Sequence, residues 1–322
     1  MKKIGWLLLL PCLALAALAQ QADPGPTDQA TPQGTIPTTA SFPIERPQTP
    51  SKADIYCAGF VNKQVLPNAN FVAGGLNTPN TTKFVNQDLI YLSGHGYQTG
   101  QQYTVLRELV DANRYEMFPG QQAMLNAMGQ PYAELGRIRI VDTRSKSAVA
   151  SVEYTCEPID PGDIVVPFVE KADIPYHPPL RFDRFVPPNH ATSGRIVAAK
   201  DFDSVLGTGA KVYLNVGANQ GVKVGDYFRA VRAYEADLKD PVDSLSFAGY
   251  DVVETTQKRP PTVEPHMFAR SKGPVIHIAD LPRRAVGELV ILSTTPTTAT
   301  GMLVFSLEDV HLGDGVELDQ QQ

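Results

Sequence analysis

The chain has 322 residues, 43% of them hydrophobic and 19% charged, which provides enough length and apolar content for about two domains with buried cores. Its formal net charge is -6, from 34 acidic residues against 28 Lys and Arg. This excess of acidic residues argues against nucleic acid as a partner, because neutralising phosphates requires a basic surface. The 27 prolines and 25 glycines favour short strands joined by turns over long helices.

The first 19 residues contain the three parts of a secretory signal peptide. Lys2 and Lys3 precede an apolar run, and the sequence Ala-Leu-Ala at 17–19 matches the pattern of a cleavage site. The run is interrupted by Pro11 and is shorter than the ~20 residues that a membrane-spanning helix needs. We therefore expect export to the periplasm or outer envelope, and a mature chain without a transmembrane segment.

Removal of the signal peptide leaves two cysteines, Cys57 and Cys156, in an oxidising compartment where pairing is expected. The loop that they would close spans 156 − 57 = 99 positions. A cross-link over such a loop stabilises the fold by roughly 4–5 kcal/mol when only chain entropy is considered. The alternative is two separate buried thiols. We predict one disulfide, and two free thiols in a mass spectrum of the unreduced mature protein would contradict it.

Composition divides the rest of the chain. Residues 20–52 are rich in Pro, Thr and Gln without apolar periodicity, which is typical of a disordered tether. A second cluster of prolines predicts a linker at 173–190. The expected order is therefore a signal peptide at 1–19, a tether at 20–52, a β module at 53–172, a linker at 173–190 and a second β module at 191–318.

An internal repeat relates the two modules. Residues 136–163 and 287–314 align at a constant offset of 151 without a gap. Gly136 meets Gly287, and the pair Gly162-Asp163 meets Gly313-Asp314. The second copy is longer in its middle and carries an inserted loop at about 234–282. Because loops usually carry the specificity of a small β domain, we expect this loop to form a contact surface.

Side-chain alternation within the repeat predicts a strand with one buried face. In the first copy Ala148, Ala150 and Val152 share one parity, which continues to Cys156. The pattern therefore predicts that Cys156 faces inward. Leu307 takes the equivalent inward place in the second copy.

The order of strands and turns predicts the fold class. In each copy a Tyr-Leu strand runs into a glycine-rich turn and then into an aromatic strand, at Tyr103 or Phe228. Short strands at this spacing indicate five or six strands per copy. The fold is expected to be mainly all-β, with two tandem small β-barrel or sandwich modules. One short helix is expected at 122–128, ended by Gly129.

Eight residues are expected to be structural turn residues. The aspartates that follow a turn glycine could in principle hold calcium or act in acid–base chemistry. Their recurrence at equivalent places favours a structural role, in which the carboxylate accepts hydrogen bonds from the turn backbone. The residues in question are Gly136, Gly162, Asp163, Gly225, Asp226, Gly287, Gly313 and Asp314.

Motifs for catalysis or metal binding are missing from the sequence. None of the six histidines lies in an H-x-x-x-H or H-E-x-x-H setting, and no G-x-S-x-G elbow is present. The stretch 207–211 lacks the spacing of a phosphate-binding loop. We therefore predict no catalytic residue, no cofactor and no metal site.

Two strings carry a family resemblance. KVYLNVGANQGVKVGDYF at 211–228 and GELVILSTTPTTATGMLVFSLEDVHLGDGVEL at 287–318 resemble the C-terminal domain of bacterial flagellar assembly protein T. They are equally similar to tandem β modules that follow LysM domains in some bacterial envelope proteins. The resemblance covers about half of the mature chain and consists mostly of turn glycines. It implies an extracytoplasmic structural or scaffolding role near the outer envelope or peptidoglycan, and it supplies no catalytic residues.

These observations predict an exported, non-enzymatic envelope protein that is a structural scaffold or a binding module. Its expected partner is another envelope protein or a cell-wall polymer. One alternative is a periplasmic hydrolase whose site is assembled from remote residues, which would show as a pocket holding a carboxylate pair or a His–carboxylate pair. The other alternative is a component associated with the flagellar basal-body ring.

Overall fold

The computed structural model describes residues 48–110, 115–175, 183–185, 187–233 and 282–319. These residues belong to one compact unit that begins at Glu45. The predicted signal peptide, most of the tether and nearly all of the inserted loop lie outside the described residues.

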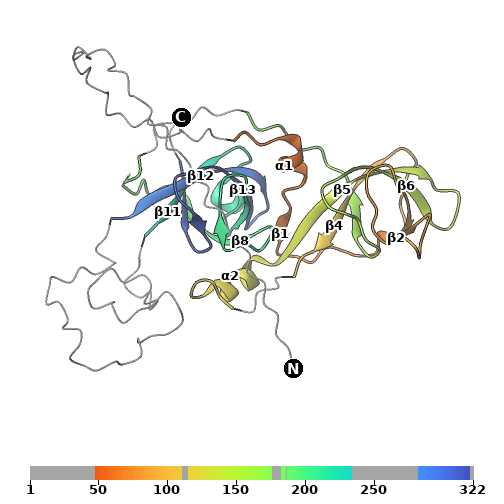
Figure 1. The fold of residues 1–322 in the computed structure, drawn as a ribbon, viewed down its shortest axis with the longest axis horizontal. Helices are drawn as coiled ribbons and strands as arrows, with labels where there is room; N and C mark the ends of the chain where they lie inside the picture. The colour runs from red at the N-terminus through yellow and green to blue at the C-terminus, as the bar shows by residue number, and fades with distance from the viewer. Residues whose placement is uncertain (1–47, 111–114, 176–182, 186, 234–281, 320–322) are drawn as a thin grey trace, which may run out of the picture. The chain divides into compact units, whose positions relative to one another are not determined.

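The first barrel consists of six antiparallel strands (Figure 1). In space they follow the order β2-β3-β6-β5-β4-β7, and the pairing of β7 with β2 closes the ring. Strand β1 adds to the beginning of β5. The bounds are β1 Phe60–Asn62, β2 Phe71–Gly75, β3 Leu89–Ser93, β4 Gln102–Glu108, β5 Gln130–Asp142, β6 Ala148–Thr155 and β7 Ile164–Pro167.

The second barrel repeats the same topology with six further strands. Its ring order is β8-β10-β13-β12-β11-β15, which matches the first ring strand for strand. The bounds are β8 Ser193–Ala199, β10 Lys211–Leu214, β11 Tyr227–Arg232, β12 Arg284–Thr294, β13 Ala299–Ser306 and β15 Gly315–Leu318. Strands β9 (Val205–Leu206) and β14 (Val310–His311) form a separate pair. The mainly β prediction is therefore confirmed, and both modules are closed barrels.

The offset of 151 residues that aligns the two copies in sequence also relates the strand register of the two barrels. Gly136 lies opposite Thr155 in the first barrel, and Gly287 lies opposite Ser306 in the second. Two register shifts in the β5–β6 pair recur at the equivalent places in the β12–β13 pair. At Gly136 and Gly287 a Cβ atom would collide with a carbonyl oxygen of the neighbouring strand. Both glycines were expected in turns, but they lie within strands β5 and β12. Glycine is required at both positions by the close approach of two backbones.

The register shift overturns one expectation about the disulfide. Ala148, Ala150 and Val152 are buried as predicted, but the shift at Glu153 inserts an extra residue and reverses the alternation beyond it. Cys156 is only half-buried, and Leu307 is 44% exposed. The prediction that these two positions face inward is therefore wrong.

The disulfide itself is confirmed. Cys57 and Cys156 are bonded, with their Cα atoms 5.8 Å apart. Cys57 is the C-cap of α1 (Lys52–Tyr56), so the bond ties this helix to the end of β6. A disulfide of this kind indicates an oxidising compartment.

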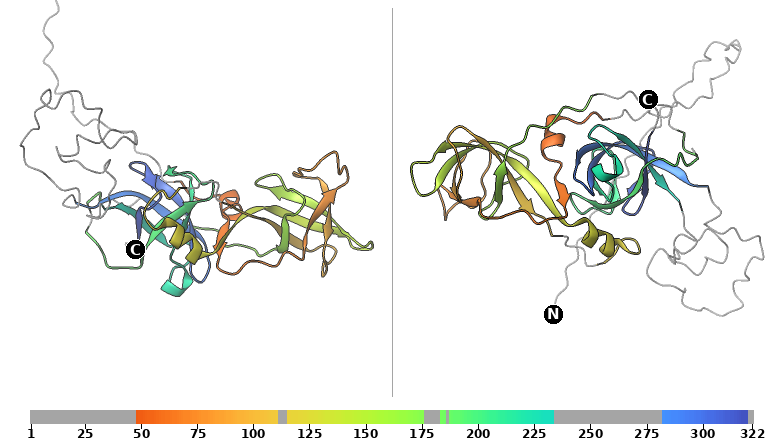
Figure 2. Two further views of the ribbon diagram at one scale, coloured as in Figure 1. Left: turned by 90° about the horizontal axis from the view of Figure 1, so that it is seen from below. Right: turned by 180° about the vertical axis from the view of Figure 1, so that it is seen from behind.

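Helix α2 (Gln121–Met128) forms where a helix was expected, and it ends at Gly129. It packs on β8 of the second barrel, although it lies in the chain between two strands of the first (Figures 1 and 2). Met128 is 3% exposed and belongs to the core of the second barrel. The Gln121 side chain donates a 2.9 Å hydrogen bond to the carbonyl of Val197.

Helix α1 covers the outer face of the second barrel. Ile55 and Ala58 pack with Val290, Met302 and Val304, which point away from the barrel interior. Consequently β13 is buried on both faces and lacks the alternation of a half-exposed strand. The residues assigned to the first module thus complete the core of the second.

Candidate functional site

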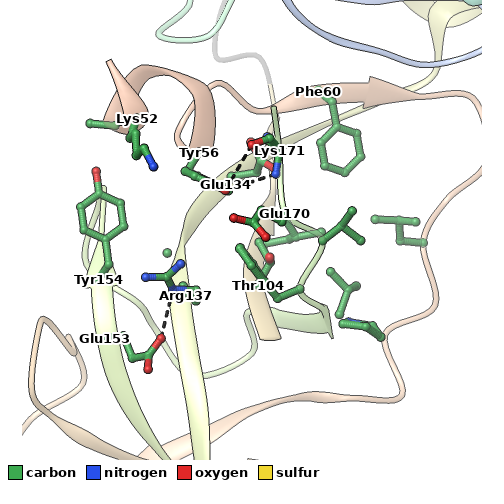
Figure 3. Close-up of a pocket in the computed structure, with 18 residues that line it drawn as sticks. Lys52, Tyr56, Phe60, Thr104, Glu134, Arg137, Glu153, Tyr154, Glu170 and Lys171 are labelled. Carbon is green, nitrogen blue, oxygen red and sulfur yellow. Dashed lines mark hydrogen bonds and ion pairs between the residues drawn. The ribbon is translucent and has the colours of Figure 1, made fainter. Parts of the chain in front are cut away.

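A cavity of about 660 Å³ lies on the outer face of the first barrel, beside α1 (Figure 3). Val105, Leu135 and Val165 fill the barrel interior, so most of their chain neighbours face outward and line the cavity. The lining residues are Lys52, Ala53, Tyr56, Phe60, Leu66, Thr104, Leu106, Glu134, Gly136, Arg137, Glu153, Tyr154, Val166, Pro167, Phe168, Val169, Glu170 and Lys171.

One end of the cavity is apolar. Leu106 is 1% exposed and packs with Phe60, Leu66 and Val166. Phe60 also stacks on Tyr132, with the ring centroids 5.5 Å apart. The hydroxyl of Tyr132 accepts a 2.8 Å hydrogen bond from the backbone N–H of Leu66, which fixes the loop after β1 against the barrel.

A buried ion pair connects α1 to the barrel. Glu134 on β5 accepts hydrogen bonds from the Lys171 ammonium at 2.7 Å and from the backbone N–H of Gly59 at 3.1 Å. Burial raises the pKa of Glu134, and the charge and hydrogen bond of Lys171 oppose that rise. Lys171 also donates to the carbonyl of Ile55 at 2.9 Å. The hydroxyl of Tyr56 accepts a 3.1 Å bond from the Lys171 backbone, so the Tyr56 ring is held at the cavity wall.

The register shift in β6 shapes the opposite wall. Because the extra residue reverses the alternation, Glu153 and Tyr154 both line the cavity although they are consecutive in the strand. The Tyr154 hydroxyl lies 3.3 Å from the Sγ atom of Cys57. The disulfide therefore borders the site without lining it.

Arg137 on β5 reaches into the cavity between these walls (Figure 3). Its Nε atom lies 3.0 Å from an oxygen of Glu153, but the geometry is not that of a hydrogen bond. Its guanidinium carbon lies 5.2 Å from the centre of the Phe168 ring, which in turn stacks on Tyr56 at 5.7 Å. This arrangement holds a cation over an aromatic platform.

Glu153 is shared between two arginines. It accepts a 2.6 Å hydrogen bond from Gln102 and a further bond from the Nε of Arg139, in addition to its ion pair with Arg137. Burial acts to raise the pKa of Glu153, but the bonds from Arg139 and Gln102 outweigh it and lower the pKa. Glu153 is therefore ionised at neutral pH.

The predicted turn aspartates lie in equivalent networks. Asp163 accepts two bonds from the Arg107 guanidinium, at 2.8 and 2.7 Å, and Asp314 accepts two from Arg232, at 2.9 and 2.7 Å. Each carboxylate also accepts from the backbone N–H three residues earlier. Asp226 accepts a 2.8 Å bond from the backbone of Lys223.

The turn glycines differ in their conformational demands. Gly162, Gly225 and Gly313 have φ angles of 99°, 91° and 97°, which favour glycine. Gly136 is the one predicted turn residue that lines the cavity. The two arginines of the turn networks were missed by the sequence analysis, although Arg107 and Arg232 stand at the same spacing from Tyr103 and Phe228.

The structure places the two described turn histidines at the surface. His95 and His311 are both exposed. Within the described ranges, His, Cys, Asp and Glu side chains form no group of three that could hold a metal ion. Among the helices that the structure describes, none combines the length and apolar character required to cross a membrane.

Comparison with known proteins gives no match, either to protein-family models or to curated proteins.

Proposed function

We propose that this chain is an exported, non-enzymatic protein of the cell envelope that binds an envelope component in the cavity beside α1. The proposal depends on one observation: the buried and half-buried acids of the cavity are neutralised, Glu134 by Lys171 and Glu153 by Arg137 and Arg139. Aromatic and aliphatic side chains make up most of the remaining wall. A concave, largely apolar site with a few oriented polar groups is typical of ligand binding.

Two features support the proposed compartment. The first 19 residues have the pattern of a signal peptide, and the Cys57–Cys156 disulfide requires oxidising conditions to persist. The partner class, an envelope protein or a cell-wall polymer, follows from this compartment and from the resemblance to modules of envelope proteins. A role at the flagellar ring rests on that resemblance alone, and a deletion strain that swims normally would exclude it.

A hydrolase is less well supported by the same cavity. A general acid or base needs a carboxyl or imidazole that is free to exchange a proton with a substrate. Glu134 and Glu153 are instead engaged by cations, so the exposed Glu170 has neither a free second carboxyl nor a histidine to act with in the described lining.

The proposal is tested by capture from fractionated envelope. The mature chain is immobilised and incubated separately with periplasmic extract, detergent-solubilised membrane and purified cell-wall sacculi. We expect one fraction to yield a component that is retained. A Phe168→Ser variant removes the ring beneath Arg137 and should lose most of that retention, whereas a His95→Ala variant at an exposed turn should keep it. Circular dichroism establishes that both variants are folded.

Equal retention by the Phe168→Ser variant, or no retention above blank resin in any fraction, would refute the proposed function.

A further inference from the structure

We infer that the cavity binds one carboxylate group carried on an apolar body, with the carboxylate against Arg137 and the apolar body against Phe60, Leu66 and Val166. The inference deepens the proposed function by naming the chemistry of the ligand. It rests on the contacts of the Arg137 guanidinium, the charges around it, and the difference between the two copies of the repeat.

The Arg137 guanidinium is held in place while its outer N–H groups remain available to a ligand. Phe168 supports its face, and Glu153 faces its Nε atom. Among the described residues, Glu153 is the one acid paired with Arg137, and it approaches from the Nε edge. The Arg137 side chain remains 37% exposed, so its outer nitrogens are accessible from the cavity. A planar guanidinium with free N–H groups is suited to a carboxylate, which it binds through two parallel hydrogen bonds.

The local charges favour an anion with a single charge. Arg137 and Arg139 share the one carboxylate of Glu153, so these three side chains together carry one net positive charge. The carboxylate of Glu170 faces Arg137 across the cavity (Figure 3). Glu170 repels any anion that approaches Arg137, so a second negative charge on the ligand would meet repulsion that one net positive charge cannot offset. A monocarboxylate therefore fits better than a phosphate or a dicarboxylate.

The apolar end determines the rest of the ligand. Phe60, Leu66 and Val166 pack around the buried Leu106 and provide a surface without charged groups. The volume of about 660 Å³ lies within the range of small-molecule sites, roughly 300–1,000 Å³. An aliphatic chain or the apolar side chains of a short peptide would fill this end and exclude water from it.

The second copy of the repeat lacks these groups, so the cavity is not a general property of the barrel. At the offset of 151, Glu288 stands in place of Arg137 and Asp319 in place of Phe168. On the outer face of the second barrel, Ile55 and Ala58 pack against Val290 and Met302. The site is therefore specific to the first barrel, where α1 forms a wall instead of a cover.

Two sources supply this chemistry: a fatty acid, and the free C-terminus of an apolar peptide. Isothermal titration calorimetry on the mature, oxidised chain separates them. The probes are decanoate and N-acetyl-Leu-Leu with a free carboxylate. Decanamide and the C-terminal amide of the peptide are the matched neutral probes, and decyl phosphate is the dianion. We expect at least one carboxylate probe to bind, and its amide and decyl phosphate to bind at least tenfold more weakly.

Variants at two arginines, one in the cavity and one outside it, identify the group responsible. Arg137→Gln should weaken binding of the carboxylate probe by about ten- to a hundredfold, the usual effect of losing a hydrogen-bonded charge. Arg144→Gln is the matched control, because Arg144 pairs with Asp142 at an exposed turn and does not line the cavity. It should change the affinity by less than about threefold. If Arg137→Gln fails to fold, the comparison of carboxylate and amide probes on the unmodified chain still decides the inference.

The inference is overturned if neither carboxylate binds, if an amide binds as tightly as its carboxylate, or if both arginine variants lose affinity equally. Capture of an envelope component that depends on Phe168, together with no binding of either carboxylate, would refute this inference and leave the proposed function standing.

Discussion

Asp163 and Asp314 each accept three hydrogen bonds at the turn that precedes the last strand of a barrel. Two donors belong to one guanidinium and the third is a backbone N–H. The same arginine donates to a backbone carbonyl in that turn, at Pro158 in the first copy and Asp309 in the second. One buried carboxylate thus fastens the closing strand to the strand that carries the arginine.

Replacing Asp314 should therefore cost more stability than replacing Asp226. The Asp314 side chain is 6% exposed, and its removal leaves the charge of Arg232 buried without its main partner. We expect Asp314→Ala to lower the free energy of unfolding by about 3 kcal/mol. Asp226 accepts one backbone hydrogen bond in a half-buried turn, so Asp226→Ala should cost about 1 kcal/mol. Urea denaturation measures both, and equal losses would contradict this account of the turns.

Glu288 is a buried acid whose pKa is raised. It is 8% exposed on β12, and burial raises its pKa from 4.5 to about 7. The charge of Asp319 adds to the rise, and that of Arg229 opposes it. Because the pKa is higher in the folded state, the protonated form favours folding, and this contribution is lost as the pH rises from about 4.5 through 7.

A Glu288→Gln variant should consequently change stability in a pH-dependent way. At pH 8 the glutamine avoids a buried charge, so the melting temperature should rise by a few degrees relative to the unmodified chain. At pH 4 both side chains are neutral and the two proteins should melt within about one degree of each other. Calorimetry at the two pH values makes the comparison, and a variant that melts lower at pH 8 would show that the ionised form is stabilised instead.

Among the secondary-structure elements, β6 contains a register shift that the alternation of its side chains could not predict. The pattern predicts buried positions correctly from Ala148 to Val152, where side chains alternate regularly. Beyond that point the shift inserts an extra residue and turns both Glu153 and Tyr154 outward. A bulge depends on the partner strand, here on the absence of a side chain at Gly136, so the pattern of one strand cannot reveal it.

The disulfide links α1 to the end of β6, and the two faces of this helix contact different barrels. Ile55 packs on the second barrel, while Tyr56 lines the cavity of the first. A Cys57→Ser/Cys156→Ser variant should lose roughly 4–5 kcal/mol of unfolding free energy, as the chain-entropy argument gives for a cross-link that closes a loop of this length. Urea denaturation of this variant is compared with that of the unmodified chain in reductant, which should lose the same amount. An undiminished stability in both would mean that α1 stays docked through packing alone.

At the scale of the whole molecule, side chains from the first part of the chain complete the second barrel. Val61, Phe118 and Met128 belong to its main core. The hydroxyls of Thr298 and Thr300 donate to the carbonyls of Val61 and Gly59 at 2.7 and 3.0 Å. The two modules are therefore not independent in stability, although they are copies in topology.

Cooperative unfolding follows from this sharing of core residues. Differential scanning calorimetry of the mature chain should show one transition for both barrels. Residues 187–319 produced alone should melt at least several degrees lower, because Val290, Met302 and Val304 lose the cover of α1. Two well-separated transitions, one of them matching the isolated fragment, would contradict the coupling.

Export can be tested independently of any ligand. A chain without residues 2–19 should remain in the cytoplasm, where reducing conditions keep Cys57 and Cys156 as thiols. Thiol labelling after cell fractionation measures both properties. A truncated chain that still leaves the cytoplasm would contradict the signal peptide.

The duplication, the strand content, the short helix and the pairing of the two cysteines were all predictable from the amino-acid sequence. Each of these is encoded locally or by a constant offset: alternation, turn glycines, and a spacing of 151 residues. The cavity, in contrast, was not predictable, because it forms where distant segments pack together. Tyr56, Arg137 and Phe168 come from three separate segments, and they meet because a helix docks beside a barrel and a bulge turns two consecutive side chains to the same wall. Such contacts depend on how distant segments pack, and no periodicity within a single segment records them.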